Sequence, residues 1–236
     1  MKKLLTAFAI ILLSVTVTAS AAGKFDGEPE GTFDLTVIHG IAGLPMPVEV
    51  FVNGDFAFAF DFNESVGPLA LPAGDYLFEV KLDGATVLDA DVTLGEGMNY
   101  TAIAHETFID GVDSGIKLSL FENNTSSLAN DKIRLTVRHT ADAPAVDAAL
   151  LRGWWLRWFV TKGIDISNAD DAMPTQFGPA DYYRGVLSAL LLPTGTSDVV
   201  FDSGRNFYQG GKSYTVYAIG SIFDGTFTLF VQTIDL

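Results

Sequence analysis

The sequence predicts an all-β protein, with two tandem antiparallel β-sandwich (Ig-like) domains after a cleavable signal peptide. Three observations carry this prediction. Apolar and polar residues alternate with the period of a strand, dipeptides that favour hairpin turns recur, and the two halves of the chain share motifs in the same order. Strands at regular spacing with turn signals between them are typical of a sandwich.

The alternation is clearest in the first half of the chain. Phe33, Leu35 and Val37 share one face of an expected strand, and every second residue of 56–62 is phenylalanine. The dipeptide Asn53-Gly54 precedes that phenylalanine run and favours the positive φ angles of a type I′ turn. We therefore expect a β-hairpin there, and a second one at Asp83-Gly84.

Motifs of the first half return in the second half. The segment LTVIH at residues 35–39 returns as LTVRH at 135–139, and Tyr100-Thr101 has a counterpart in Tyr214-Thr215. Matching order along the chain indicates a duplicated domain. We expect a signal peptide at 1–21, an N-terminal linker at 22–32, a first domain at 33–122, a linker at 123–131 and a second domain at 132–236.

The first residues have the pattern of an export signal. Lys2 and Lys3 precede an apolar stretch at 4–17, and Ala19-Ser20-Ala21 has the small-x-small form of a cleavage site. A membrane-spanning helix needs roughly 20 apolar residues, and this stretch is shorter. We therefore expect no membrane span and a protein that is secreted or periplasmic.

Composition excludes several classes of function. The chain has 29 acidic and 14 basic residues, for a formal net charge of −15, and it has no cysteine. So acidic a surface repels nucleic acid, and stability must come from packed cores rather than disulfides. The sequence also lacks a Gly-x-Ser-x-Gly elbow and a glycine-rich phosphate loop with lysine, so we expect a protein that is not an enzyme.

Three segments resemble the DUF4397 family. Residues 137–147 (VRHTADAPAVD) are similar to the family's opening motif, residues 71–76 (LPAGDY) to its L-P-A-G-x-Y motif, and residues 211–220 to its G-x-x-Y-T-V-x-A-I-G motif. The resemblance implies β-rich domains of secreted or envelope-associated proteins, in two tandem copies and with no known activity. The first copy lacks the aspartate that precedes the proline, so a role for Asp142 cannot be assumed in both halves.

His39 and His139 occupy equivalent positions at the ends of expected strands. We interpret each as a partly buried imidazole that hydrogen-bonds the loop after it, with Asp147 or Glu49 close by in the fold. The alternative is a metal ligand or a pH-sensitive contact. His105 has no second histidine at a ligand spacing, so it does not favour a metal site.

The three tryptophans gather in residues 154–158, which we align with the phenylalanine strand at 56–62. Alternation leaves Trp155, Arg157 and Phe159 together on one face, and Tyr183 could extend it from a neighbouring strand. Aromatic and arginine side chains are frequent at binding hot spots and suit sugar rings. This face is the predicted binding surface, for a protein or a carbohydrate of the cell envelope.

A short loop gathers hard oxygen ligands, which are Asp165, Asn168, Asp170 and Asp171. Calcium prefers such ligands, although the spacing differs from that of an EF-hand. A solvated acidic loop and a calcium site both fit this segment, and calcium is the only cofactor that the sequence suggests.

Together these features predict an exported, non-catalytic binding or surface-interaction module whose ligand the sequence does not identify. A structural envelope protein that self-associates through exposed strand edges is the alternative. A hydrolase with an unrecognised site is the third possibility.

Overall fold

The computed structural model describes residues 31–44, 47–109, 112–152, 158–168 and 175–236. The predicted signal peptide and most of the predicted N-terminal linker lie outside these ranges. The residues described form strands and loops without a helix, so none offers a helix that could cross a bilayer. The predicted all-β fold class is confirmed.

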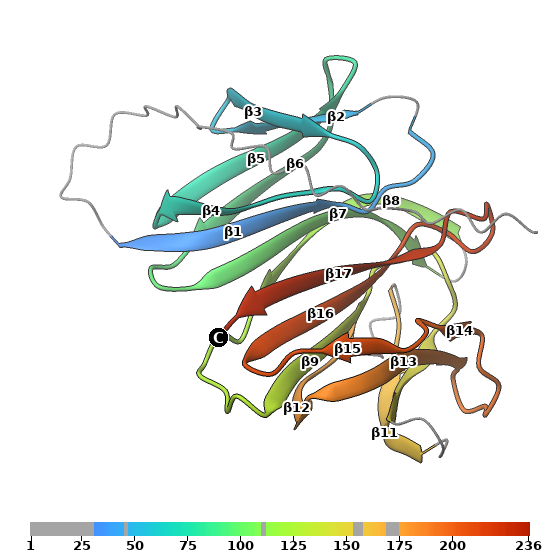
Figure 1. The fold of residues 1–236 in the computed structure, drawn as a ribbon. Coiled ribbons are helices and arrows are strands. Elements are labelled where there is room, and N and C mark those ends of the chain that lie inside the picture. The colour runs from blue at the N-terminus through green and yellow to red at the C-terminus, as the bar shows by residue number, and fades with distance from the viewer. Residues whose placement is uncertain (1–30, 45–46, 110–111, 153–157, 169–174) are drawn as a thin grey trace, which may run out of the picture.

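Two sheets make up the first half of the chain (Figure 1). One has the strand order β4-β1-β7-β8, from β1 (Thr32–His39), β4 (Ser65–Pro72), β7 (Asn99–Ile109) and β8 (Val112–Glu122). The other has the order β3-β2-β5-β6, from β2 (Val48–Val52), β3 (Asp55–Phe60), β5 (Gly74–Leu82) and β6 (Ala85–Leu94).

The second half repeats this arrangement. One sheet has the order β12-β9-β16-β17, from β9 (Lys132–His139), β12 (Gln176–Tyr183), β16 (Lys212–Ile219) and β17 (Thr228–Asp235). The other has the order β11-β10-β13-β14, from β10 (Val146–Arg152), β11 (Trp158–Ile166), β13 (Gly185–Pro193) and β14 (Phe201–Asp202), with β15 (Asn206–Tyr208) also paired to β13.

The strands pair antiparallel except at one place in each half. Strand β1 runs parallel to β7, and β9 runs parallel to β16. Sequence alternation gives no strand direction, so these pairs were not predicted. A parallel pair needs a crossover, and the chain makes each one by passing through the opposite sheet before it returns.

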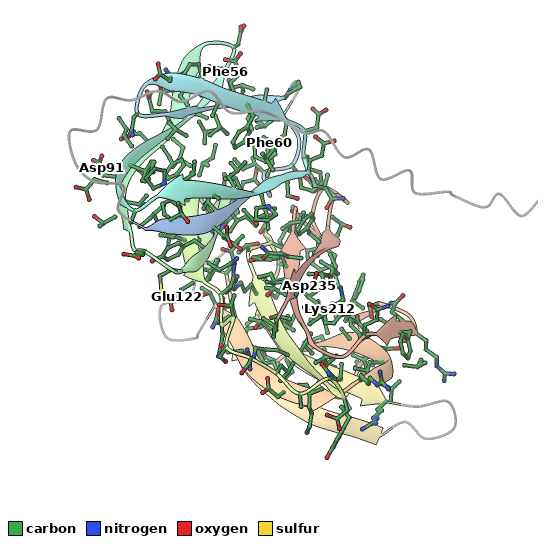
Figure 2. The ribbon with its side chains drawn as sticks, turned by 60° about the vertical axis from the view of Figure 1, so that its left-hand side comes forward. Phe56, Phe60, Asp91, Glu122, Lys212 and Asp235 are labelled. Atoms are coloured by element: carbon green, nitrogen blue, oxygen red, sulfur yellow. The ribbon has the colours of Figure 1, made fainter. Side chains whose placement is uncertain are left out.

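The predicted faces and turns occur as expected. Phe33, Leu35 and Val37 are buried in the core of the first half, and Figure 2 shows Phe60 inside that sandwich. Both residues of Asn53-Gly54 have positive φ, as do both residues of Asp83-Gly84. Positive φ at both central positions is the signature of a type I′ hairpin.

The two halves pack against each other through their β1 and β9 sheets, which lie side by side in Figure 1. The contact has a core of its own, formed by Ile38, Ile103, Tyr217 and Ile219, with Phe62, Phe121 and Phe230 packed around it. Strands β9 and β16 are therefore buried on both faces.

A buried arginine crosses this contact. Arg138 donates from Nε to Gln176 Oε1 at 3.1 Å and from Nη1 to Asn123 Oδ1 at 3.0 Å and to the Tyr217 hydroxyl. Its guanidinium also lies 4.2 Å from the ring centroid of Phe121. Asn123 is buried in turn, and its Nδ2 donates to Thr101 Oγ1 at 2.8 Å. Hydrogen bonds therefore hold both Arg138 and Asn123 in place at the contact between the halves.

Replacing Arg138 with leucine should destabilise the whole protein. The change leaves the acceptors of buried Asn123 and half-buried Gln176 without their donor, which costs about 1–3 kcal/mol for a buried group and less for a half-buried one. Urea unfolding followed by far-UV circular dichroism should show a loss of about 2–5 kcal/mol. Arg184→Leu is the matched control because Arg184 is exposed. Equal stability of the two variants would contradict a clamping role for Arg138.

Candidate functional site

An apolar cavity of about 260 Å³ lies at one end of the second half. An apolar cavity of roughly 150 Å³ is enough to hold benzene, so this one has room for a ligand group. Its lining is apolar apart from one histidine, and consists of His139, Ala143, Pro144, Ala145, Val146, Leu191, Pro193, Val200, Phe201, Ala218, Ile222 and Phe227.

Three loops that follow buried strands build the cavity. One connects β9 to β10 at residues 140–145, the next connects β13 to β14 at 194–200, and the last connects β16 to β17 at 220–227. Ala143, Ala145 and Ala218 contribute only methyl groups to the lining, which leaves the space open. One wall is aromatic, because the rings of Phe201 and Phe227 pack edge to face with centroids 5.8 Å apart.

Hydrogen bonds hold two of these loops together. The Asp142 carboxylate accepts from Ser221 Oγ at 2.6 Å, and its backbone N–H donates to the Gly220 carbonyl at 2.8 Å. Gly220 has φ +74°, and a Cβ there would lie 2.6 Å from the Thr226 carbonyl oxygen. The aspartate of the motif at 137–147 therefore braces the cavity wall, and only glycine fits opposite it.

Exposed apolar side chains stand on two of the loops that build the cavity. Val199 and Val200 stand on one side, with 62% of Val200 exposed, and Ile222 and Phe223 stand on the other, with 73% of Phe223 exposed. Val200 and Ile222 also line the cavity, so the patch is continuous with the interior. Exposed apolar patches that join a concave site are typical of binding surfaces.

His139 is the one titratable residue in the lining. It is buried, and its Nε2 lies 3.1 Å from the Pro144 carbonyl oxygen. A carbonyl only accepts, so Nε2 donates and Nδ1 carries the free lone pair of a neutral imidazole. That Nδ1 has no hydrogen-bond partner. In the first half the equivalent His39 accepts at Nδ1 from the Ile41 N–H at 3.2 Å. The predicted hydrogen bond to the loop is thus confirmed for both histidines, and both are buried more fully than expected.

All three histidines are buried and neutral. Burial lowers the pKa of His39 to about 4 and that of His105 to about 4, and it also lowers the pKa of His139. His105 is placed by hydrogen bonds, at 2.8 Å to Ser119 Oγ and 2.8 Å to the Glu106 carbonyl oxygen. Each histidine gains a proton more readily when the chain unfolds than when it is folded.

Stability should therefore fall with acid between pH 6.5, the ordinary pKa of histidine, and about pH 4. In this window the unfolded chain binds protons that the folded chain excludes, so the free energy of unfolding decreases by about 1.4 kcal/mol per pH unit for each histidine. Urea unfolding at several pH values measures the slope. His105→Gln should reduce this slope by the contribution of one histidine. An unchanged slope in that variant would show that protonation of His105 does not cause the loss of stability in acid.

The predicted aromatic binding face lies only partly within the ranges described. Trp155 and Arg157 are outside them, and Phe159 is placed on β11 by its backbone alone. Tyr183 is 51% exposed, with Lys132 Nζ at 3.6 Å and the Arg152 guanidinium at 5.5 Å from its ring centroid. This end of the second half thus joins an aromatic ring to two cations, and the predicted binding face stays a prediction.

The alignment of the tryptophan run with the phenylalanine strand is wrong. Val48 pairs with Phe60, and its counterpart Val146 pairs with Ile166. Ile166 therefore takes the place of Phe60, and Trp158 lies at the start of β11, before the residues that match the phenylalanine strand. The hairpin between β10 and β11 is longer than the one between β2 and β3. The alignment of the two halves from sequence did not allow for these extra residues.

The predicted calcium ligands are likewise only partly described. Asp165 lies opposite Asp147 in the backbone register of β10 and β11. Asn168 is buried, and its Nδ2 donates to the carbonyls of Ala141 at 2.7 Å and Glu106 at 3.1 Å. Asp170 and Asp171 lie outside the ranges described, within which no group of three His, Cys, Asp or Glu could hold a metal. Calcium stays a prediction.

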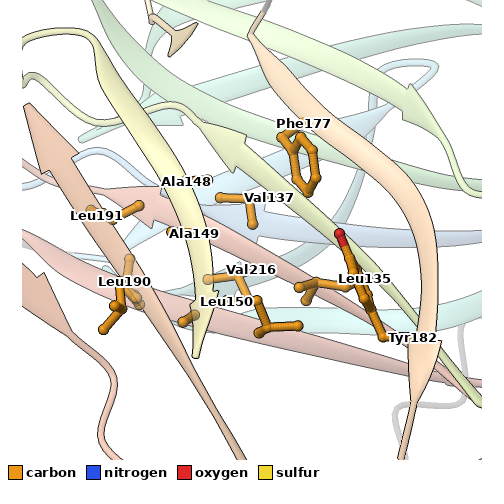
Figure 3. Close-up of a pocket in the computed structure, with 12 residues that line it drawn as sticks. Leu135, Val137, Ala148, Ala149, Leu150, Phe177, Tyr182, Leu190, Leu191 and Val216 are labelled. Atoms are coloured by element: carbon orange, nitrogen blue, oxygen red, sulfur yellow. The ribbon is translucent and has the colours of Figure 1, made fainter. Parts of the chain in front are cut away.

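A second space occurs inside the core of the second half (Figure 3). It lies among side chains of both sheets, including Leu135, Leu150 and Val216, and its volume is about 10 Å³. One water needs at least that much, so this is a packing gap and not a ligand site.

The larger cavity remains the candidate. Sequence reasoning missed it because small and aliphatic residues carry no motif, although the exposed Val199-Val200 pair was a signal.

Comparisons with known proteins give a family match for part of the chain and no activity. No curated protein matches the chain. A solved structure with some likeness is a carbohydrate-binding module of family CBM26 from Eubacterium rectale Amy13K in complex with maltoheptaose, with 12% identity over 84% of this chain and 96% of that chain and a TM-score of 0.24. A TM-score this low supports no inference about fold or ligand. Residues 33–149, from β1 to the middle of β10, match the DUF4397 family, a domain of unknown function.

Proposed function

We propose that this protein is an exported, non-catalytic binding module whose ligand inserts an apolar group into the cavity beside His139. The observation that carries the proposal is the open apolar cavity with exposed apolar side chains at its mouth. Leaving Val200 and Phe223 in water is unfavourable, and a ligand that covers them recovers this hydrophobic free energy.

The lining supports binding rather than catalysis. Of the residues that line the cavity, His139 alone can transfer a proton, and its Nε2 is already bonded to the loop. Burial keeps the pKa of His139 below its usual value, which makes the ring a weak base at neutral pH. No lining side chain is a hydroxyl, a thiol or a carboxylate.

We also propose that the two halves are copies of one DUF4397 domain. Equal strand order and the parallel pair in each half support a duplication. The second copy is the binding half in this proposal. Ile41 is fully buried where the second half has Ala141, so the first half has a larger side chain beneath the equivalent loop. The export of the protein rests on the signal pattern at residues 1–21.

Blocking the cavity should abolish binding of a simple apolar probe. Each buried methylene contributes about 0.8 kcal/mol, so 1-octanol should bind and raise the melting temperature. Ala145→Phe should remove this shift because the ring occupies the cavity, whereas Ala59→Phe on exposed β3 should retain it. Isothermal titration calorimetry gives the affinities.

The alternative of self-association makes the opposite prediction for this surface. If Phe223 and Val200 pair with another copy, sedimentation velocity should show concentration-dependent oligomers without any ligand, and Phe223→Asp should dissolve them. A protein that stays monomeric and binds no apolar probe would contradict both functions.

A further inference from the structure

We propose that the ligand of this cavity is a cationic amphiphile, in which the apolar group that enters the cavity carries a protonated amine. This inference rests on the proposed function and adds the charge of the ligand to it. It comes from the charged side chains of the segments that form the cavity, all of which are carboxylates.

The three segments that form the cavity and its mouth are acidic. Residues 139–146, 193–202 and 218–227 contain four aspartates and neither lysine nor arginine. Two of these aspartates stand next to the exposed apolar side chains, because Asp198 precedes Val199-Val200 and Asp224 follows Ile222-Phe223. A cation whose apolar part fills the cavity would be attracted at the mouth.

Asp224 is held in a fixed position. Its Oδ1 accepts from the Thr226 N–H at 2.9 Å and from Thr226 Oγ1 at 2.6 Å. These bonds lower the pKa of Asp224, so the charge is present throughout the neutral range. The turn that carries it contributes Ile222 and Phe227 to the lining, which places this carboxylate beside the opening rather than on a remote surface.

The interior of the cavity holds no positive charge. His139 lines it, and burial lowers the pKa of this histidine, so the ring is neutral. Every other lining side chain is a hydrocarbon. A fatty acid or an anionic lipid would bring a second negative charge toward the aspartates, so these ligands are disfavoured.

Three probes with the same eight-carbon chain test the charge directly. Calorimetric titration with octylammonium, 1-octanol and octanoate, in 20 and 300 mM salt, should give the order ammonium, alcohol, carboxylate from tightest to weakest. Partly screened carboxylates near the mouth should give a preference for ammonium over alcohol on the order of 3- to 10-fold in low salt. The preference should shrink in high salt.

A double variant, Asp198→Asn with Asp224→Asn, assigns the preference to the mouth. It should remove most of the advantage of octylammonium and leave 1-octanol binding unchanged, because asparagine keeps the shape and can still accept from Thr226. The matched control is Asp89→Asn with Asp91→Asn, which removes the same charge from exposed positions on β6 in the first half. Figure 2 shows Asp91 at the outer side of that half.

The outcomes separate the two proposals. If 1-octanol binds and octylammonium binds no more tightly, the charge inference is overturned while the proposed function stands. If no probe binds, both are overturned. If the ammonium preference persists in the Asp198 and Asp224 double variant, or disappears equally in the control, the preference does not arise at this mouth and the inference fails.

Discussion

The packing of the β1 sheet against the β9 sheet is the constraint on which the rest of the structure depends. It buries the central strands of the β9 sheet on both faces, so β9 and β16 have almost no residue in contact with solvent. Polar residues on those strands must then find partners inside the protein. Arg138 does so through Gln176, Asn123 and Tyr217, and the contact becomes specific as well as apolar.

This constraint also positions the candidate site. Strands β9 and β16 end at His139 and Ile219, and the loops that follow them form two of the three walls of the cavity. Both strands are fixed by packing on either side, and the bond from Ser221 to Asp142 joins their loops. The cavity is therefore preformed, and a ligand would not have to order its walls. Preorganisation of this kind lowers the entropic cost of binding.

Local patterns predicted the strands, the hairpins and the buried histidines, because alternation and turn chemistry are encoded by neighbouring residues. The parallel pairs and the contact between the halves were not predicted, since they join residues far apart in the chain. One local signal was present: Ile38 interrupts the alternation of Phe33, Leu35 and Val37, and it packs in the contact. The cavity was missed because it consists of space left by alanines, and empty space has no sequence motif.

The two halves differ at the positions that decide whether such a cavity exists. In the first half, the ring of His39 lies against Phe60 and near Phe62, with ring centroids 5.4 and 6.4 Å apart, and Ile41 is buried beneath the loop. In the second half the register of β10 and β11 places Ile166 in the position of Phe60. A smaller side chain therefore stands where the first half has a ring beside its histidine. The same strand order therefore carries different packing around the histidine in the two halves, and in the second half a cavity of about 260 Å³ adjoins it.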